Sequence, residues 1–375
     1  MVITISPANY IPTAQGEIMS EGLTFRRAKK EDLPRISEFR KAFFEYNPSR
    51  SCEPEYYEWK CYKNPILPGE MWLAEDGNTL VGIKSMTPKR IKILAAVVDG
   101  AETGDTFTHP DYQRRGIFTR LFKAAKECGL DARIDFIYGL PNEISLLGYE
   151  RKLDYAQVPI KLHTLVKPLK SKQVLKIKLR SPLLAVVLSP VIDAGSQAIF
   201  RIGMRGAAKS DVLIYTEPAF PEDIDTLWEQ ASKNYNVMLM RTKDYLDWRY
   251  VTNPDTYSIL IARNRDGAIL GYMVIKIGFP DNIPTGFICD FLTIQDDPNV
   301  FKKLLSTALQ DFCHRKVSFV FTRAVKGSLY YRILLWLGFL PRSRAPIVCY
   351  RNELGNQVLG GHYKWHFTMG DSDSI

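Results

Sequence analysis

The sequence lacks the features that mark export, membrane insertion or metal binding. Its first residues have neither the basic start nor the sustained apolar core of a secretory signal. No apolar run is long enough to span a bilayer. The six cysteines are scattered without Cys-x-x-Cys or Cys/His ligand spacing, which argues against a disulfide framework and against a zinc site. We therefore expect a cytoplasmic protein that needs no metal.

Acidic residues are also missing from residues 156–192, which hold seven lysines and arginines of a chain whose net charge is +9. The remainder is close to neutral, which argues against a protein that is basic throughout in order to bind nucleic acid. After Arg180 the stretch turns apolar without the alternation of a strand. Residues 161–192 are interpreted either as a peripheral membrane anchor or, as we prefer, as an interdomain connector.

One strand-turn-helix, residues 97–129, has the composition of an anion-binding turn. A strand-like run at residues 105–108 is followed by a basic turn and then by apolar residues at helical spacing. Such a turn directs free backbone N–H groups and the positive end of a helix dipole at one small volume. Gly116 permits close approach of an anion, and Arg114 and Arg115 add charge. The pattern predicts a pyrophosphate site, with a basic surface turn as the alternative.

This turn resembles the acyl-CoA loop of the GNAT N-acetyltransferase superfamily, which reads Gln/Arg-x-x-Gly-x-Gly/Ala between the fourth strand and the third helix. The segment Gln113-Arg114-Arg115-Gly116-Ile117-Phe118 matches the first four positions, and Phe118 replaces a small residue at the last. The resemblance spans roughly residues 22–160. It implies that residues 113–118 hold the pyrophosphate and that the amides near Phe107 and Thr108 pair with pantetheine.

Two positions downstream also follow the family's pattern, after a predicted fifth strand at residues 135–138. Asn142 stands where the family often contacts the pantetheine arm, and Tyr149 stands where a tyrosine often lies beside the CoA sulfur. The resemblance therefore implies that Asn142 binds the cofactor and that Tyr149 protonates the leaving thiolate. The alternative for Tyr149 is a helix residue that packs on the sheet. Asp154 departs from the glycine that is usual in the family.

Acyl transfer from a thioester to an amine needs a group that accepts the proton of the attacking ammonium. Glu102 and Asp105 are the carboxylates on the strand before the loop. They lie three positions apart, so strand alternation predicts opposite faces. Asp105 is nearer the cofactor end, whereas Glu102 lies deeper and would act through water. The sequence ranks the two candidates nearly equal.

The second half of the chain repeats the first. The pattern Tyr56-x-x-Trp59-Lys60-x-x-x-Asn64-Pro65 recurs at an offset of 189 residues as Tyr245-x-x-Trp248-Arg249-x-x-x-Asn253-Pro254. In both copies an apolar strand and an Asp-Gly turn follow, which predicts a helix and then a hairpin. The fold class is therefore α/β (α+β), with two tandem GNAT-like modules that each contain a mixed, mostly antiparallel twisted sheet flanked by helices. The large aromatic residues of the repeat are interpreted as core.

The predicted organisation is an N-terminal tail (1–21), a module with the acyl-CoA loop (22–160), a connector (161–210), a degenerate module (211–352) and a C-terminal tail (353–375). Opposite the basic loop, the second copy has Asp296, Asp297 and Pro298 but no glycine. Carboxylates repel a pyrophosphate and proline lacks a donor. The cofactor is therefore expected in the first module alone.

The C-terminal tail has aromatic and acidic residues that are unusual for a chain end. Trp365 and Phe367 predict that the tail docks on the protein, and Asp371 and Asp373 would then face a cationic amine. A frayed acidic end is the alternative.

Together these observations predict an acyl-CoA-dependent N-acyltransferase that uses acetyl-CoA or another acyl-CoA. By analogy with two-domain relatives, the acceptor is the amine of a small molecule or amino sugar. Two alternatives stay open. A Fem-type transferase would take its acyl group from aminoacyl-tRNA, against which the near-neutral remainder and Gln113 count. A non-catalytic scaffold at a membrane is the other, and the departures at Phe118 and Asp154 favour it.

Overall fold

The structure is a computed structural model that describes residues 11–12, 18–20, 22–42, 52–170, 190, 194–195, 202–203 and 211–373. Most of the predicted basic and apolar connector therefore lies outside the described residues. No helix within these ranges is sufficiently long and apolar to cross a membrane.

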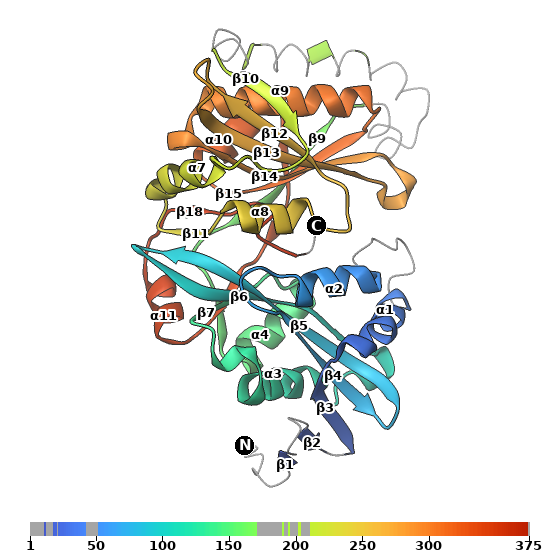
Figure 1. The fold of residues 1–375 in the computed structure, drawn as a ribbon. Coiled ribbons are helices and arrows are strands. Elements are labelled where there is room, and N and C mark those ends of the chain that lie inside the picture. The colour runs from blue at the N-terminus through green and yellow to red at the C-terminus, as the bar shows by residue number, and fades with distance from the viewer. Residues whose placement is uncertain are drawn as a thin grey trace. The chain divides into compact units, whose positions relative to one another are not determined.

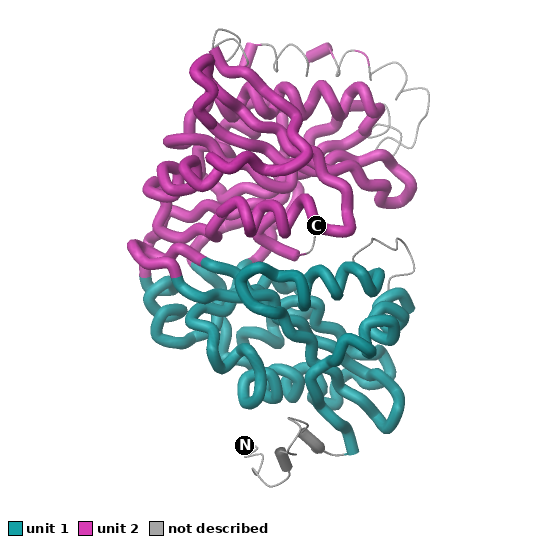
Figure 2. The backbone as a smooth tube through the Cα atoms, viewed as in Figure 1, with its two compact units in different colours: residues 1–90, 98–158, 347–360 teal, residues 91–97, 159–346, 361–375 magenta. Residues whose placement is uncertain are grey.

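The chain forms two compact units (Figure 2). Unit 1 comprises residues 1–90, 98–158 and 347–360, and unit 2 comprises residues 91–97, 159–346 and 361–375. Each unit thus contains a segment that lies within the other half of the sequence.

Unit 1 is built on a mixed sheet (Figure 1). The order of its described strands is β1-β2-β3-β4-β5-β6-β7-β17-β8. Their bounds are β1 Ile11–Pro12, β2 Ile18–Ser20, β3 Leu23–Arg27, β4 Glu70–Asp76, β5 Thr79–Ile93, β6 Ala96–Thr108, β7 Phe136–Gly139, β17 Val348–Tyr350 and β8 Tyr155–Gln157. Neighbouring strands are mostly antiparallel, whereas β6 and β7 run parallel.

The helices of unit 1 are α1 Leu33–Lys41, α2 Pro54–Tyr62, α3 Ile117–Cys128, α4 Glu143–Lys152 and α11 Glu353–Gly360. Helix α3 buries Ile117 and Leu121 against Phe25 and Trp72 of the sheet. Helix α4 buries Tyr149 in a neighbouring cluster that includes residues of α3 and β7. Helices α3 and α4 therefore cover the same face of the sheet.

Unit 2 contains a second mixed sheet with the strand order β10-β12-β13-β14-β15-β9-β16. The bounds are β10 Leu213–Glu217, β12 Ser258–Arg263, β13 Ile269–Gly278, β14 Thr285–Thr293, β15 Phe319–Val325, β9 Leu162–Pro168 and β16 Leu340–Ala345. Two further strands, β11 Val237–Leu239 and β18 Trp365–His366, pair in parallel, and β11 also pairs with residues 91–93 at the end of β5. The helices are α7 Ile224–Ala231, α8 Lys243–Tyr250, α9 Pro298–His314 and α10 Leu329–Trp336.

The predicted repeat is present in the structure. Tyr56 and Trp59 are buried on α2 with ring centroids 5.4 Å apart, and Tyr245 and Trp248 are buried on α8 with centroids 5.6 Å apart. Hairpins β4–β5 and β12–β13 follow these helices. The predictions of two mixed sheets flanked by helices and of core aromatic residues are confirmed.

The two sheets also exchange strands. Strand β9 follows β8 of unit 1 in sequence but lies between β15 and β16 of unit 2. Conversely, β17 follows β16 of unit 2 but lies between β7 and β8 of unit 1. The repeat pattern did not predict this exchange.

Candidate active site

The candidate site of unit 1 begins where β6 continues beyond its parallel partner. Strands β6 and β7 pair from Gly100 with Phe136 to Thr103 with Gly139, where β7 ends. Strand β6 then continues to Thr108. Within this continuation Asp105 has φ 41°, in the left-handed region that strand residues rarely adopt. The parallel pair therefore opens at Gly104, and the backbone of β6 changes direction one residue later.

The predicted glycine loop connects β6 to α3. Gly116 is the N-cap of α3 with φ 75°, and no side chain of the described residues caps this helix end. A Cβ at this position would meet Arg120 only at ordinary contact distance, 3.6 Å, so conformation rather than crowding requires the glycine. Arg114 also has a positive φ, 64°. The first turn of α3 thus presents uncapped backbone donors, with the positive end of a three-turn helix behind them.

The remaining loop residues are divided between the surface and the core. Gln113 follows a short 3-10 turn, and the Arg115 guanidinium lies over the Tyr112 ring at 4.7 Å from its centroid. The Ile117 side chain is buried in the core beneath the loop. At the end of β6, the Phe107 ring packs edge-on against Phe39. Of these residues, the backbone groups, the Gln113 side-chain amide and the guanidinium groups of Arg114 and Arg115 are suited to contact an anion.

Phe118, the departure from the family's small residue, packs against α4. Its ring lies 5.7 Å from the Tyr149 ring and 5.0 Å from the Phe122 ring, between centroids. A Cβ added to Gly148 would lie 2.9 Å from the Phe118 ring, so α4 needs a glycine where the two helices meet. Phe118 therefore joins the first turn of α3 to the helix that carries Tyr149.

Tyr149 is buried on α4 and takes part in an aromatic cluster. Its ring contacts Phe118, Phe122 and Tyr155 at centroid distances of 5.7, 5.3 and 5.1 Å. Burial raises the pKa of Tyr149 to about 12, although the polar side chains of Thr106 and Thr103 of β6 oppose this rise. The phenol thus stays protonated at neutral pH and lies against the strand at which the sheet opens.

Asn142 is the N-cap of α4. Its side-chain oxygen accepts hydrogen bonds from the backbone N–H and the hydroxyl of Ser145, at 2.8 and 2.9 Å. Asx caps of this kind stabilise helix ends by roughly 1 kcal/mol. The residue therefore has a structural role at the end of β7, and its contact with pantetheine stays a prediction.

The prediction that Glu102 and Asp105 lie on opposite faces is wrong. Ala101 and Met86 pack in the cluster on the α3–α4 side, so the adjacent residues Glu102 and Ser85 lie on the other side of the sheet. Asp105 lies on that side too, because it accepts from Lys60 of α2 and from the Ser85 hydroxyl, at 2.6 and 3.4 Å. The positive φ at Asp105 shifts the alternation by one residue.

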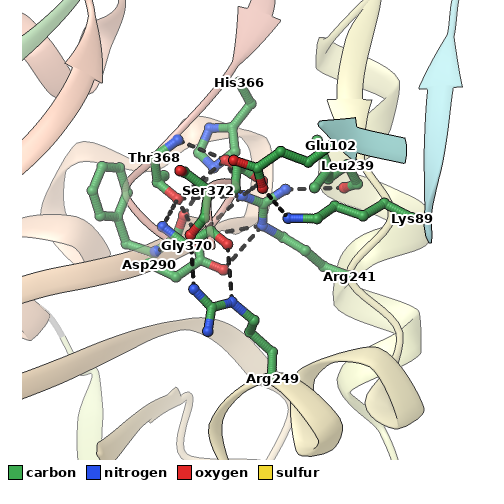
Figure 3. Close-up of polar contacts among 12 residues, drawn as sticks. Lys89, Glu102, Leu239, Arg241, Arg249, Asp290, His366, Thr368, Gly370 and Ser372 are labelled. Carbon is green, nitrogen blue, oxygen red and sulfur yellow. Dashed lines mark hydrogen bonds and ion pairs between the residues drawn. The ribbon is translucent and has the colours of Figure 1, made fainter. Parts of the chain in front are cut away.

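Both carboxylates are held by cations. Asp105 accepts from Lys60 Nζ at 2.6 Å and from an Arg40 guanidinium nitrogen at 3.0 Å. Glu102 is buried and forms an ion pair of 2.8 Å with the fully buried Lys89 (Figure 3). The two carboxylates therefore lie across β6 from the Tyr149 hydroxyl, with Asp105 the more accessible of the two.

The corresponding helix start in unit 2 is closed by a side chain. Helix α9 follows β14 as α3 follows β6, and its N-cap is Asp297. The Asp297 carboxylate accepts from the backbone N–H groups of Asn299 and Val300, at 2.7 and 3.2 Å. Asp296 is buried and bound by Tyr235 and Lys364. The donors that a phosphate would need are thus already satisfied by a carboxylate.

The opening of the unit 2 sheet is filled by the C-terminal tail. Strands β14 and β15 pair in parallel up to Ile288 with Thr322, so Cys289 corresponds to Gly104 of unit 1. The Gly370 N–H of the tail donates to the Cys289 carbonyl at 2.7 Å. Arg249 donates to the Ser372 carbonyl at 2.8 Å (Figure 3). The tail therefore occupies the edge of β14 at the point where the parallel pair opens.

Docking of the tail is thus confirmed, whereas the exposed role predicted for Asp371 is wrong. Asp371 and Asp290 are both buried and share the guanidinium of Arg241, at 2.8 and 3.1 Å. Burial favours the neutral form of Asp290, but the charge of Arg241 prevails and lowers the pKa of this carboxyl. Asp373 is buried as well. These carboxylates hold the tail in place and are not offered to an amine from solution.

The cations that surround the carboxylates were not among the residues predicted from the sequence. Arg40, Lys89 and Arg241 belong to no short motif, and only their pairing in the fold identifies them. Lys60 did carry a signal, because Arg249 stands at the same position of the repeat and both side chains are fully buried. A basic residue retained among core aromatic residues in both copies indicates a buried partner.

Residues 24–157 match the model of the acetyltransferase (GNAT) domain family. No curated protein sequence matches the chain significantly. The solved structures that share its fold include three at 12% identity. A probable N-acyltransferase from Enterococcus faecalis has a TM-score of 0.57 and covers 87% of this chain and 72% of its own. The values are 0.58, 88% and 83% for myristoyl-CoA-bound N-myristoyltransferase from Saccharomyces cerevisiae, and 0.56, 87% and 72% for a GCN5-related N-acetyltransferase from Anabaena variabilis.

Proposed function

We propose that this chain, which carries a GNAT acetyltransferase domain at residues 24–157, is an acyl-CoA-dependent N-acyltransferase with its cofactor in unit 1. The observation that carries the proposal is the contrast between two corresponding helix starts. In unit 1 the N-cap of α3 is an uncapped left-handed glycine beside two arginines, whereas in unit 2 the N-cap of α9 is a carboxylate. A pyrophosphate is stabilised at the first and repelled at the second.

The residues of unit 1 fit an acyl-CoA. The α3 amides and the guanidinium groups of Arg114 and Arg115 would hold the pyrophosphate. The opened edge of β6, from Gly104 to Thr108, would pair with the amides of the pantetheine arm. The Gly370 contact with Cys289 supports this assignment, because it is a backbone hydrogen bond made at the corresponding edge of unit 2. We propose acetyl-CoA as the donor.

The bound acyl-CoA supplies an activated thioester, so the protein has to orient the reactants and move two protons. One of the carboxylates takes a proton from the ammonium of the acceptor, Asp105 directly or Glu102 through a water molecule, which frees the amine for attack. The nitrogen loses a second proton as the amide forms, and this proton replaces the one that Tyr149 gives to the sulfur. Amides near Phe107 and Thr108 hold the carbonyl oxygen as negative charge develops on it. The Tyr149 hydroxyl delivers its proton to the leaving sulfur from the other side of β6. The acceptor is proposed to be the amine of a small molecule or amino sugar.

The proposal is tested by incubating the purified protein with acetyl-CoA and a panel of amines and amino sugars while the release of free thiol is followed. Amine-dependent thiol release that is lost in the Tyr149→Phe variant is the expected result. Release that does not depend on any amine of the panel would contradict transfer to this class of acceptor. Saturable acetyl-CoA binding measured in parallel separates a wrong acceptor class from a wrong cofactor.

A further inference from the structure

Unit 1 contains a cavity on the same side of the sheet as α3 and α4, but at the ends of these helices rather than at the glycine loop. Its volume is about 220 Å³. It touches the second half of α3 and residues 152–154, where α4 ends. The proposed transfer reaction does not use it.

The floor of this cavity is apolar and aromatic. Phe122, Ile137, Leu153 and Tyr155 line it, and all four side chains are buried. Burial raises the pKa of Tyr155 well above its ordinary value, so this phenol adds no charge. An apolar floor of this kind favours a ligand with an apolar body.

The mouth of the cavity is basic. Lys123, Lys126 and Lys152 lie along it and are exposed. Lys126 is held there by the Tyr350 ring, with its ammonium 4.6 Å from the ring centroid. Asp154 is the carboxylate exposed at this mouth. The mouth therefore carries more positive than negative charge.

The remaining carboxylate of the lining does not offset these lysines. Asp131 is bound by Lys84, with the Nζ at 3.1 and 3.2 Å from its two oxygens. Lys84 is fully buried and lies 4.9 Å from the centroid of the Phe122 ring. Lys84 thus compensates the charge of Asp131 within the wall of the cavity. The charges of the lysines at the mouth are therefore not neutralised by Asp131.

We propose that this cavity binds a small amphipathic anion, with a compact apolar body on the aromatic floor and one carboxylate at the lysines. A cavity of about 150 Å³ accepts benzene, so 220 Å³ admits a somewhat larger body, such as an aromatic acid or a carboxylic acid of about eight carbons. The charged mouth favours the free acid over a neutral molecule with the same body.

Calorimetric titration of the full chain with octanoate tests the proposal, with 1-octanol as an uncharged ligand of the same chain length. The expected result is one octanoate site per chain and at least tenfold weaker binding of 1-octanol. Lys126→Glu combined with Lys152→Glu should weaken octanoate binding at least tenfold. The control pair, Lys63→Glu with Lys233→Glu, changes the net charge equally at exposed positions away from the cavity and should bind like the wild type.

The proposal would be overturned by no octanoate binding to the wild type, by equal affinity for 1-octanol, or by binding that the Lys126/Lys152 variant leaves unchanged. Thermal melting verifies that both double variants are folded. The Gly116→Val variant and saturating coenzyme A should leave octanoate affinity unaltered. Displacement of octanoate by coenzyme A would instead place it in the cofactor site, which makes failure of this inference distinguishable from failure of the proposed function.

Discussion

Gly116 and Asp297 are the N-cap residues of corresponding helices, and they make the two helix starts chemically opposite. Gly116 leaves the first amides of α3 uncapped, whereas the Asp297 carboxylate accepts from the first amides of α9. The helix dipole attracts anions at the N-termini of both α3 and α9. Because the Asp297 carboxylate already occupies the start of α9, only the start of α3 can accept a phosphate. This difference is the basis of the predictions on the cofactor.

Gly116→Val should weaken acetyl-CoA binding at least tenfold. A left-handed conformation costs a residue with a side chain roughly 1–2 kcal/mol, and valine is expected to relieve this cost by moving the amides of the loop. Gly267→Val is the matched control, because Gly267 also has a positive φ, 84°, but lies in a hairpin turn of unit 2 with open space around it. Calorimetry should find normal affinity for the control. Equal losses in both variants would indicate general destabilisation instead.

Tyr149→Phe should lower kcat by about 100-fold, the usual scale for a general acid, with acetyl-CoA affinity nearly unchanged. Because burial raises the pKa of Tyr149 to about 12, the hydroxyl keeps its proton throughout the neutral and mildly alkaline range. Wild-type kcat should therefore show no loss below about pH 10 from ionisation of this group. Steady-state kinetics and calorimetry provide the two measurements. A large loss of affinity would recast Tyr149 as a binding residue.

Asp105→Asn and Glu102→Gln distinguish the two routes for the ammonium proton. If Asp105 accepts the proton directly, Asp105→Asn should lower kcat about 100-fold and Glu102→Gln should lower it much less. If a water on Glu102 accepts it, the order reverses. The pH profile of kcat/KM is the readout, because the acidic limb should disappear only in the variant that lacks the base. An unaltered profile in both variants would rule out the carboxylates.

Deletion of residues 369–375 should destabilise unit 2 and leave acetyl-CoA affinity intact. The deletion removes Asp371, so Arg241 is left buried with less compensation, and loss of one partner from a buried ion pair costs roughly 3–5 kcal/mol. Denaturant unfolding and calorimetry measure the two effects. Unchanged stability after the deletion would contradict the structural role assigned to the tail.

Stability should fall as the pH decreases below about 6.5, because of His366. Burial lowers the pKa of His366 to about 3, so between pH 6.5 and 3 the unfolded chain binds a proton that the folded chain does not. At pH 5 this difference amounts to about 2 kcal/mol. His366→Gln, which can keep a donor for the Phe291 carbonyl, should show a smaller loss of melting temperature between pH 7.5 and pH 5 than the wild type. Identical losses would assign the effect to other groups.

Local pattern was sufficient to predict much of unit 1. Helical spacing predicted α3, and the basic glycine turn before it was predicted as an anion-binding loop; the left-handed conformation of Gly116 is known only from the structure. The repeat predicted the paired burial of Trp59 and Trp248, because large aromatic residues at helical spacing are usually core. Each of these features depends on a short local pattern of residues, and the repeat shows that one such pattern occurs twice in the chain.

The features that sequence missed depend on distant contacts or on one backbone angle. The exchange of β9 and β17 pairs strands from opposite halves of the chain, and no local signal encodes such pairing. Strand alternation places Asp105 and Glu102 on opposite faces of the sheet. The positive φ of Asp105 turns its side chain to the face that Glu102 occupies. The burial of Asp371 depends on Arg241, which lies 130 positions earlier in the sequence.

The most direct test of the central claim is the stoichiometry of acetyl-CoA binding to the purified chain, measured by calorimetric titration. An uncapped α3 and a carboxylate-capped α9 predict one site per chain, which Gly116→Val weakens and Gly267→Val preserves. Two sites per chain would contradict the assigned difference between the units. No binding to a folded protein would contradict the use of acetyl-CoA and would turn attention to other acyl donors.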